Sequence, residues 1–83
     1  MAAVRPLRDL SEVLRDGMTE GPRVLKLLSE RPRSIPELAT ALGRPAREVT
    51  LWVMMLRRYG KVGEVPKSPT DEYYRYRSLE VLP

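Results

Sequence analysis

Hydrophobic positions recur at helical spacing from the start of the chain. The first set predicts a short helix over about residues 7–16, and Gly17 is placed to end it, because glycine commonly follows a last helical turn. A second helix is predicted from Thr19, its N-terminal cap, to about Arg31, with Pro22 in the first turn, where proline is tolerated. The hydrophobic residues of these two predicted helices are Leu7, Leu10, Val13 and Leu14, followed by Val24, Leu25, Leu27 and Leu28.

Two further helices are predicted on either side of a Gly-Arg-Pro turn. Ser34 caps the first of them, and Glu37 stands three residues later, which is the spacing of a capping box. Gly43 ends that helix, and the next one runs from about residue 46 to 59, with Gly60 as its stop. Their inward-facing residues are Ile35, Leu38, Ala41 and Leu42 in the first, and Val49, Trp52, Val53 and Leu56 in the second.

The last third of the chain predicts a β-hairpin with a loose tip. Residues 61–65 are β-prone, residues 66–71 are rich in turn-forming types, and residues 72–78 are rich in tyrosine and arginine. Side chains alternate along a strand, so we assign Tyr74 and Tyr76 to packing and the opposite face to an anion. That opposite face carries Tyr73, Arg75 and Arg77, and the tail of residues 79–83 is too short to assign.

Length and composition favour one small binding domain over an enzyme. The chain has 83 residues, 42% hydrophobic and 31% charged, as is typical of a soluble globular domain with a single core. It contains no cysteine and no histidine, which excludes disulfides, thiolate or imidazole metal sites and catalysis that needs either residue. No glycine-rich phosphate loop is present, so we expect neither catalytic activity nor a cofactor or metal. No stretch resembles a signal peptide or a membrane span, so we expect a cytoplasmic protein without membrane contact.

Positive charge is concentrated in the C-terminal half of the chain. The formal net charge is +4; residues 1–43 contribute +1 and residues 44–77 contribute +4, and Glu80 brings the total back to +4. Attraction for a polyanion such as nucleic acid therefore belongs to residues 44–77.

Three helices followed by a hairpin, with a short turn between the second and third helices, resemble the winged helix-turn-helix domains of bacterial and archaeal transcription regulators. The resemblance covers residues 19–78, and its most specific part is residues 34–62, where a helix ends in Leu-Gly and a glycine leads into the hairpin. It implies a mainly α fold with a three-helix core plus wing. Residues 1–18 would form an N-terminal extension with an extra short helix, and residues 79–83 a C-terminal tail.

The resemblance also implies a function, namely a small transcriptional regulator that binds duplex DNA. In that family the third helix usually enters the major groove, and the wing lies along the phosphate backbone or the minor groove. Carried onto this sequence, the expected DNA-binding residues are Arg44, Arg47, Thr50, Arg57, Arg58, Lys61, Lys67, Arg75 and Arg77.

The helix predicted over residues 46–59, the third of the winged-helix core, differs from a typical DNA-recognition helix. Its outward face carries Leu51 and Met54, with Met55 to one side, where groove recognition needs hydrogen-bonding groups, and Glu48 near the front would repel phosphate. The alternative is therefore a winged-helix module for protein–protein interaction. In that case the apolar face of this helix would be covered by a partner protein, by a second copy in a homodimer, or by the N-terminal helix of the same chain. The expected interface residues are Leu51, Met54, Met55, Leu10 and Leu14. For the hydrophobic residues of the N-terminal helix, we favour a role in dimerisation over packing on the chain's own core.

Overall fold

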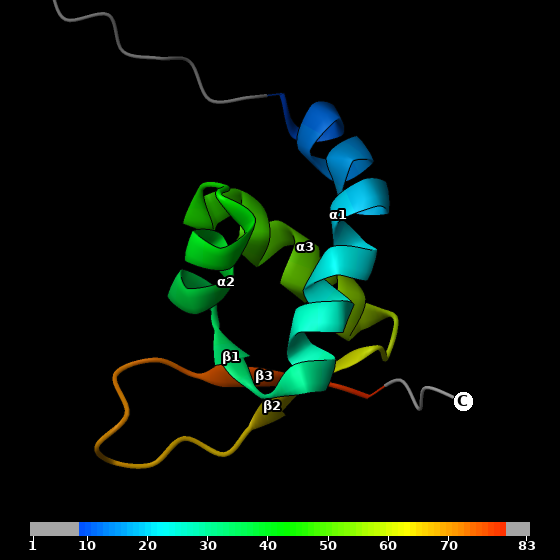
Figure 1. The fold of residues 1–83 in the computed structure, drawn as a ribbon. Helices are drawn as coiled ribbons and strands as arrows, with labels where there is room; N and C mark the ends of the chain where they lie inside the picture. Colours follow the sequence, from blue (N-terminus) through cyan, green and yellow to red (C-terminus); the bar gives the residue numbers. More distant parts are fainter. Residues whose placement is uncertain (1–8, 80–83) are drawn as a thin grey trace, which may run out of the picture.

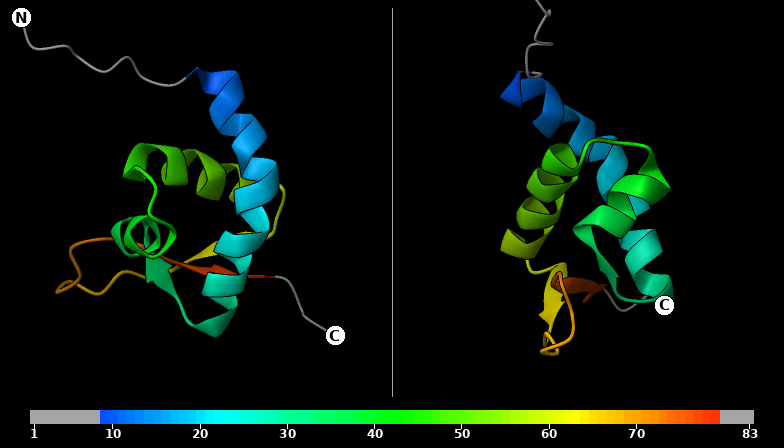
Figure 2. Two further views of the ribbon diagram at one scale, coloured as in Figure 1. Left: turned by 45° about the horizontal axis from the view of Figure 1, so that its top comes forward. Right: turned by 90° about the vertical axis from the view of Figure 1, so that its left-hand side faces the viewer.

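The computed structural model describes residues 9–79 of the chain, which form three helices and a small three-stranded antiparallel sheet (Figure 1). The chain is mainly helical with a small sheet, as the sequence predicts. The helices cross one another on one side of the sheet (Figure 2). In chain order the elements are α1 (Leu10–Glu30), β1 (Arg33–Ser34), α2 (Ile35–Leu42), α3 (Ala46–Arg58), β2 (Val62–Val65) and β3 (Arg75–Ser78).

The N-terminal half of the chain corrects the prediction of two separate helices. A single helix, α1, runs through Gly17 and contains Pro22, so Gly17 does not end a helix and Thr19 does not cap one. Its cap is Asp9, whose side chain accepts a hydrogen bond from the Ser11 amide at 3.0 Å. The helix continues because one face of it is buried along its length, and this burial outweighs a local cost of about 1 kcal/mol for glycine and about 3 for proline.

This continuity removes the expected extra N-terminal helix. The boundary predicted between residues 18 and 19 falls within α1, whose buried face includes Val13, Val24 and Leu28. Leu7, the first hydrophobic residue of the predicted short helix, lies outside the described residues.

The capping box of α2 is confirmed. The Ser34 hydroxyl accepts a hydrogen bond from the Glu37 amide at 3.3 Å, and the Glu37 carboxylate accepts one from the Ser34 amide at 3.0 Å. Gly43 then ends the helix in the left-handed conformation, with a φ of +66°, which glycine adopts without steric cost. Helix α3 begins at Ala46, as predicted, and ends at Arg58, within one residue of the prediction.

The sheet contains one strand more than the predicted hairpin. Its order is β1-β3-β2, so β3 is the central strand and pairs with both neighbours. Strand β1 is only two residues long, too short for an alternating pattern, and it pairs with residues more than forty positions away. Tyr76 on β3 is buried, as predicted, but the packing role predicted for Tyr74 is wrong: Tyr74 precedes the strand and is half exposed.

The core is centred on Trp52 of α3, which is fully buried. Its indole Nε1 donates a hydrogen bond to the backbone carbonyl oxygen of Val13 in α1, at 2.7 Å. Gly17 lies directly against the same ring: a β-carbon at this position would be 2.8 Å from Trp52 Cδ1 and 3.0 Å from Met55 Cε. The close approach of α1 and α3 therefore requires glycine at position 17.

Substituting the two glycines of α1 tests this packing. Gly17→Ala should destabilise the protein by about 1–3 kcal/mol, because the added methyl group overlaps the indole and outweighs the better helix propensity of alanine. Gly21→Ala is the matched control, since its β-carbon would meet only Leu56, at an ordinary 3.8 Å, and should stabilise the protein by up to about 1 kcal/mol. Urea unfolding followed by circular dichroism measures both; equal effects of the two substitutions would contradict the packing argument.

The capping box predicts a pH dependence of stability. Hydrogen bonding from the Ser34 backbone, followed by smaller contributions from its hydroxyl and nearby arginines, lowers the pKa of Glu37 from its usual 4.5, against a smaller desolvation effect. A carboxyl group with a lowered pKa in the folded state stabilises the fold above its usual pKa, and this contribution is lost as the pH falls through the folded value. The stability of the wild type relative to Glu37→Gln should therefore decrease between pH 7 and pH values below 4.5. Urea unfolding of both proteins across this range measures it, and a constant difference would refute the prediction.

Candidate nucleic-acid interface

The outward face of α3 carries two arginines around a leucine. Arg47 lies in the first turn and Arg58 at the last position, and both share the side of the helix that faces away from the buried Val49 and Val53. Leu51 lies between them and is 38% exposed. Within residues 9–79, neither Arg47 nor Arg58 forms an ion pair, and both side chains are exposed. These two guanidinium groups are open to an anionic ligand.

Arg44, in the turn between α2 and α3, is partly engaged inside the protein. Its Nε lies 3.8 Å from a carboxylate oxygen of Glu20, whose side chain is almost completely buried. Arg23 holds the same carboxylate, donating to its two oxygens at 3.0 and 3.2 Å. A buried carboxylate needs such partners, so Arg44 contributes to the fold as well as to the surface charge.

Two further arginines of the predicted set form exposed ion pairs. Arg57 lies 3.1 Å from Glu64 on β2, and Arg75 lies 3.4 Å from Asp71 in the loop that precedes β3. Both arginine side chains remain about half exposed. Exposed pairs of this kind contribute only about 0–1 kcal/mol, so either arginine can exchange its carboxylate for a phosphate at small cost.

The loop between β2 and β3 has no regular secondary structure but contains hydrogen bonds of its own. The Ser68 amide donates to the Asp71 carboxylate at 3.0 Å, and the Asp71 amide donates to the Ser68 carbonyl oxygen at 2.9 Å. Lys67 Nζ lies 5.5 Å from the centre of the Tyr74 ring, within range of a cation–π interaction. Arg77 on β3 is exposed and, among the described residues, forms no ion pair. The hairpin thus presents two exposed basic side chains, Lys67 and Arg77.

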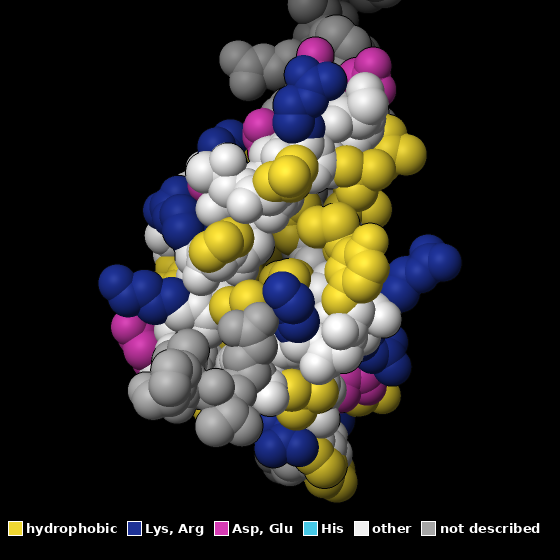
Figure 3. Space-filling model, turned by 90° about the vertical axis from the view of Figure 1, so that its right-hand side faces the viewer, with side chains coloured by type: hydrophobic (Ala, Val, Ile, Leu, Met, Phe, Trp, Pro, Cys, Tyr) yellow, Lys and Arg dark blue, Asp and Glu magenta, His cyan; other side chains and the backbone are white. Residues whose placement is uncertain are grey.

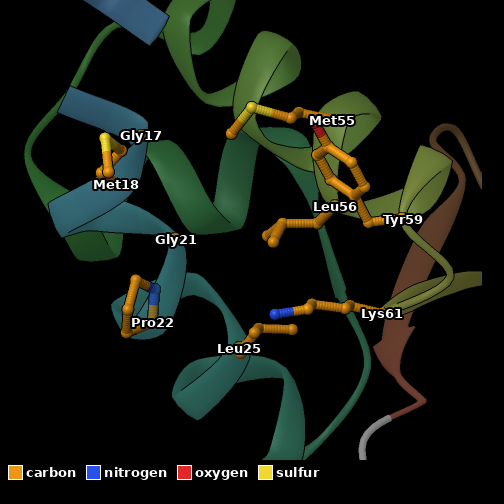
Figure 4. A pocket seen from close by; sticks show the side chains of 9 residues that line it. All are labelled: Gly17, Met18, Gly21, Pro22, Leu25, Met55, Leu56, Tyr59 and Lys61. Atoms are coloured by element: carbon orange, nitrogen blue, oxygen red, sulfur yellow. The ribbon is translucent and has the colours of Figure 1, made fainter. Parts of the chain in front are cut away.

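Two members of the predicted set are less available to a ligand on the outward face of α3. The Thr50 hydroxyl donates to the Ala46 carbonyl oxygen at 2.7 Å, and this residue is half-buried. Lys61 extends towards α1 instead of along the outward face of α3 (Figure 4). The structure therefore groups Arg47 and Arg58 on α3, places Thr50 about 60° to one side of Arg47 with its hydroxyl bonded to the backbone, and directs Lys61 away from them.

The expectation that Glu48 lies at the front of α3 is wrong. Its side chain is buried, with only 2% of the residue exposed. Glu48 stands one helical turn before Trp52 and so shares the side of α3 on which the indole packs against α1. Its carboxylate therefore presents no negative charge on the outward face.

The three apolar residues of α3 are neighbours one helical turn apart but differ in burial. Leu51 is exposed on the outward face, Met54 is partly buried against the core, and Met55 faces α1. Leu10 and Leu14 are exposed on α1. Helix α1 of the same chain thus covers part of this apolar surface at Met55, which is one of the three arrangements that the sequence leaves open.

An apolar groove between α1 and α3 is a feature that the sequence reasoning missed. It has a volume of about 620 Å³, and Figure 3 shows hydrophobic side chains gathered around it. The pattern that could have revealed it is the four-residue spacing of Leu10, Leu14 and Met18, which the supposed break at Gly17 interrupted. The groove is lined by Gly17, Met18, Gly21, Pro22, Leu25, Met55, Leu56, Tyr59 and Lys61 (Figure 4).

Comparison with known proteins identifies no relative. No protein-family model matches the chain, and no curated protein matches it. Across residues 9–79, no helix is both long enough and apolar enough to cross a membrane, and no cluster of carboxylates is arranged to hold a metal ion.

Proposed function

We propose that this protein is a winged helix-turn-helix DNA-binding protein, a small transcriptional regulator that docks α3 and the β2–β3 hairpin on duplex DNA. The observation that carries the proposal is the pair of exposed arginines, Arg47 and Arg58, at the two ends of the outward face of α3 without a carboxylate partner among the described residues. Phosphates are the natural counter-charge for such groups.

The order of the elements supports the winged-helix part of the proposal. Helices α2 and α3 follow one another across a three-residue turn that begins at Gly43, as a helix-turn-helix requires. The hairpin of β2 and β3 follows α3 directly and supplies the wing. Under this proposal α3 is the recognition helix.

The dimensions and chemistry of α3 are compatible with the major groove. Thirteen residues give a helix of about 20 Å, and the groove, about 12 Å wide, admits one helix. Arg47 can then donate to guanine or to phosphate, and Leu51 can contact only a thymine methyl group. Burial of Glu48 removes the carboxylate that would have opposed phosphate at this face.

The hairpin adds contacts of a different kind. Lys67 and Arg77 are exposed and carry charge towards a phosphate backbone. Arg57 and Arg75 join them when phosphate replaces their exposed carboxylate partners. Most of the affinity then comes from phosphate contacts, so binding should weaken steeply as salt increases.

Removing single arginines from α3 tests the proposal. Arg47→Ala and Arg58→Ala should each reduce the slope of log K against log salt by about one, the loss expected for one phosphate contact. Fluorescence anisotropy with a labelled duplex of mixed sequence, titrated between about 50 and 200 mM salt, measures the slope. Sequence-independent binding suffices for this measurement.

Arg15→Ala provides the matched control, because it removes the same charge from an exposed position on α1, which is part of neither the outward face of α3 nor the hairpin. Its slope should equal that of the wild type. The proposal is rejected if the wild type shows no salt-dependent binding, or if Arg15→Ala reduces the slope as much as Arg47→Ala does.

The protein-interaction alternative is now supported by a surface that overlaps the predicted one at Met55, Leu10 and Leu14. Leu51, Met54 and Met55 are neighbours on α3, but Met54 packs partly against the core. Met55 lines the groove beside α1, together with Leu56 and Tyr59. An interaction through this groove uses other residues than DNA binding does, so the two functions are compatible.

A further inference from the structure

We infer that the α1/α3 groove binds an acidic amphipathic helix of a partner protein. The groove is flanked by large apolar side chains that remain in solvent, above all Met18, which is 80% exposed, and Tyr59, which is 72% exposed. Isolated apolar residues are common on monomers, but a contiguous apolar surface marks a binding site. This inference stands independently of the proposed DNA binding.

The length of the apolar surface fits a helix. Leu10, Leu14 and Met18 follow one another at four-residue spacing on α1, and Pro22 and Leu25 continue the line along the groove. From residue 10 to residue 25 this line extends about 22 Å, or four helical turns. A groove between two helices accepts the apolar face of a third, which is a recurring mode of peptide recognition.

The groove contains a glycine, Gly21, whose lack of a side chain leaves room for a partner. Gly21 lies in the interior of α1, where glycine costs about 1 kcal/mol relative to alanine. Packing within the chain does not require it, since a β-carbon would meet only Leu56, at 3.8 Å. Gly21 and its neighbour Pro22 therefore weaken the helix locally and leave the groove open.

Basic residues border this apolar surface. At about 100° per residue, Arg15 is about 60° around α1 from Met18, and Lys26 is about 40° from Pro22. Lys61 extends its Nζ into the groove between Leu25 and Leu56 (Figure 4). Dark blue side chains accordingly lie on both sides of the yellow surface in Figure 3.

The acidic residues of α1 lie on another side of the helix. Glu12, Asp16 and Glu20 are spaced four residues apart and lie about 120–160° around α1 from Met18. The groove thus combines an apolar floor with a positive border, and its complement is an apolar helix face with a negative border.

The same charges argue against a second copy as the occupant. In a symmetric dimer each groove would face the identical surface, so the basic borders formed by Arg15, Lys26 and Lys61 of both copies would lie within one interface. Like charges brought together at an interface oppose association. The basic border attracts an acidic partner, whereas it repels the basic border of a second copy.

Two designed peptides test the inference. Each is a helix of about 15 residues with leucines at positions i, i+3, i+4 and i+7; one carries glutamates on the remaining faces and the other carries lysines. The labelled acidic peptide should bind the full chain in an anisotropy titration, and the lysine peptide should bind at least about tenfold more weakly.

Met18→Glu should weaken binding of the acidic peptide by at least about tenfold, because it places a negative charge at the edge of the groove. The side chain is mostly exposed, so the variant should keep the circular dichroism spectrum of the wild type. Thr40→Glu is the matched control: it adds the same charge at an exposed position of α2 that does not line the groove, and should leave binding close to that of the wild type.

Four results would overturn the inference. The first is no binding of the acidic peptide at concentrations up to about 1 mM, and the second is equal binding of the two peptides. The third is an equal effect of Met18→Glu and Thr40→Glu on binding. The fourth is a wild-type dimer in sedimentation equilibrium that Met18→Glu converts to a monomer, since a second copy would then cover the groove. The DNA titration above depends on Arg47 and Arg58, which do not line the groove. Failure of the DNA-binding proposal and failure of the groove inference are therefore distinguishable.

Discussion

The contact between Trp52 and the backbone of α1 determines where both surfaces of this protein lie. The indole is fully buried and donates to the Val13 carbonyl oxygen at 2.7 Å, and Gly17 lets the two helices approach closely enough for this bond to form. A tryptophan contributes a large buried area, and an unmet N–H in such a place would be costly. The contact therefore holds α1 across α3 and sets which sides of each helix remain in solvent.

This packing sorts the side chains of α3 into three environments. Glu48, one turn before the indole, is enclosed within the protein, whereas Met55 turns towards α1 and contributes to the groove. Arg47 and Arg58 remain outside, on the side opposite the core. A helix whose sequence mixes basic, acidic and apolar residues thus presents a basic face in one direction and an apolar edge in another.

The two proposals assign one partner to each of these directions. Phosphate chemistry accounts for exposed guanidinium groups on α3 and the hairpin, and an acidic amphipathic helix accounts for an apolar groove with a basic border. Both surfaces carry positive charge, so the excess of basic residues alone does not distinguish a DNA partner from an acidic protein partner. A small regulator that binds DNA through one surface and an acidic protein through the other would join the two.

The sequence by itself determined the features that depend on neighbours three or four residues apart. The capping box of Ser34 and Glu37, the stop at Gly43 and the extent of α3 were all predictable, because they follow from local hydrogen bonds and helical periodicity. Tertiary structure alone decided the rest: α1 continues through Gly17 and Pro22, β1 joins the sheet, and Glu48 is buried. These outcomes depend on contacts between residues far apart in the chain, whose packing free energy outweighs local propensity. The groove belongs to this second group, since neither helix forms it without the other.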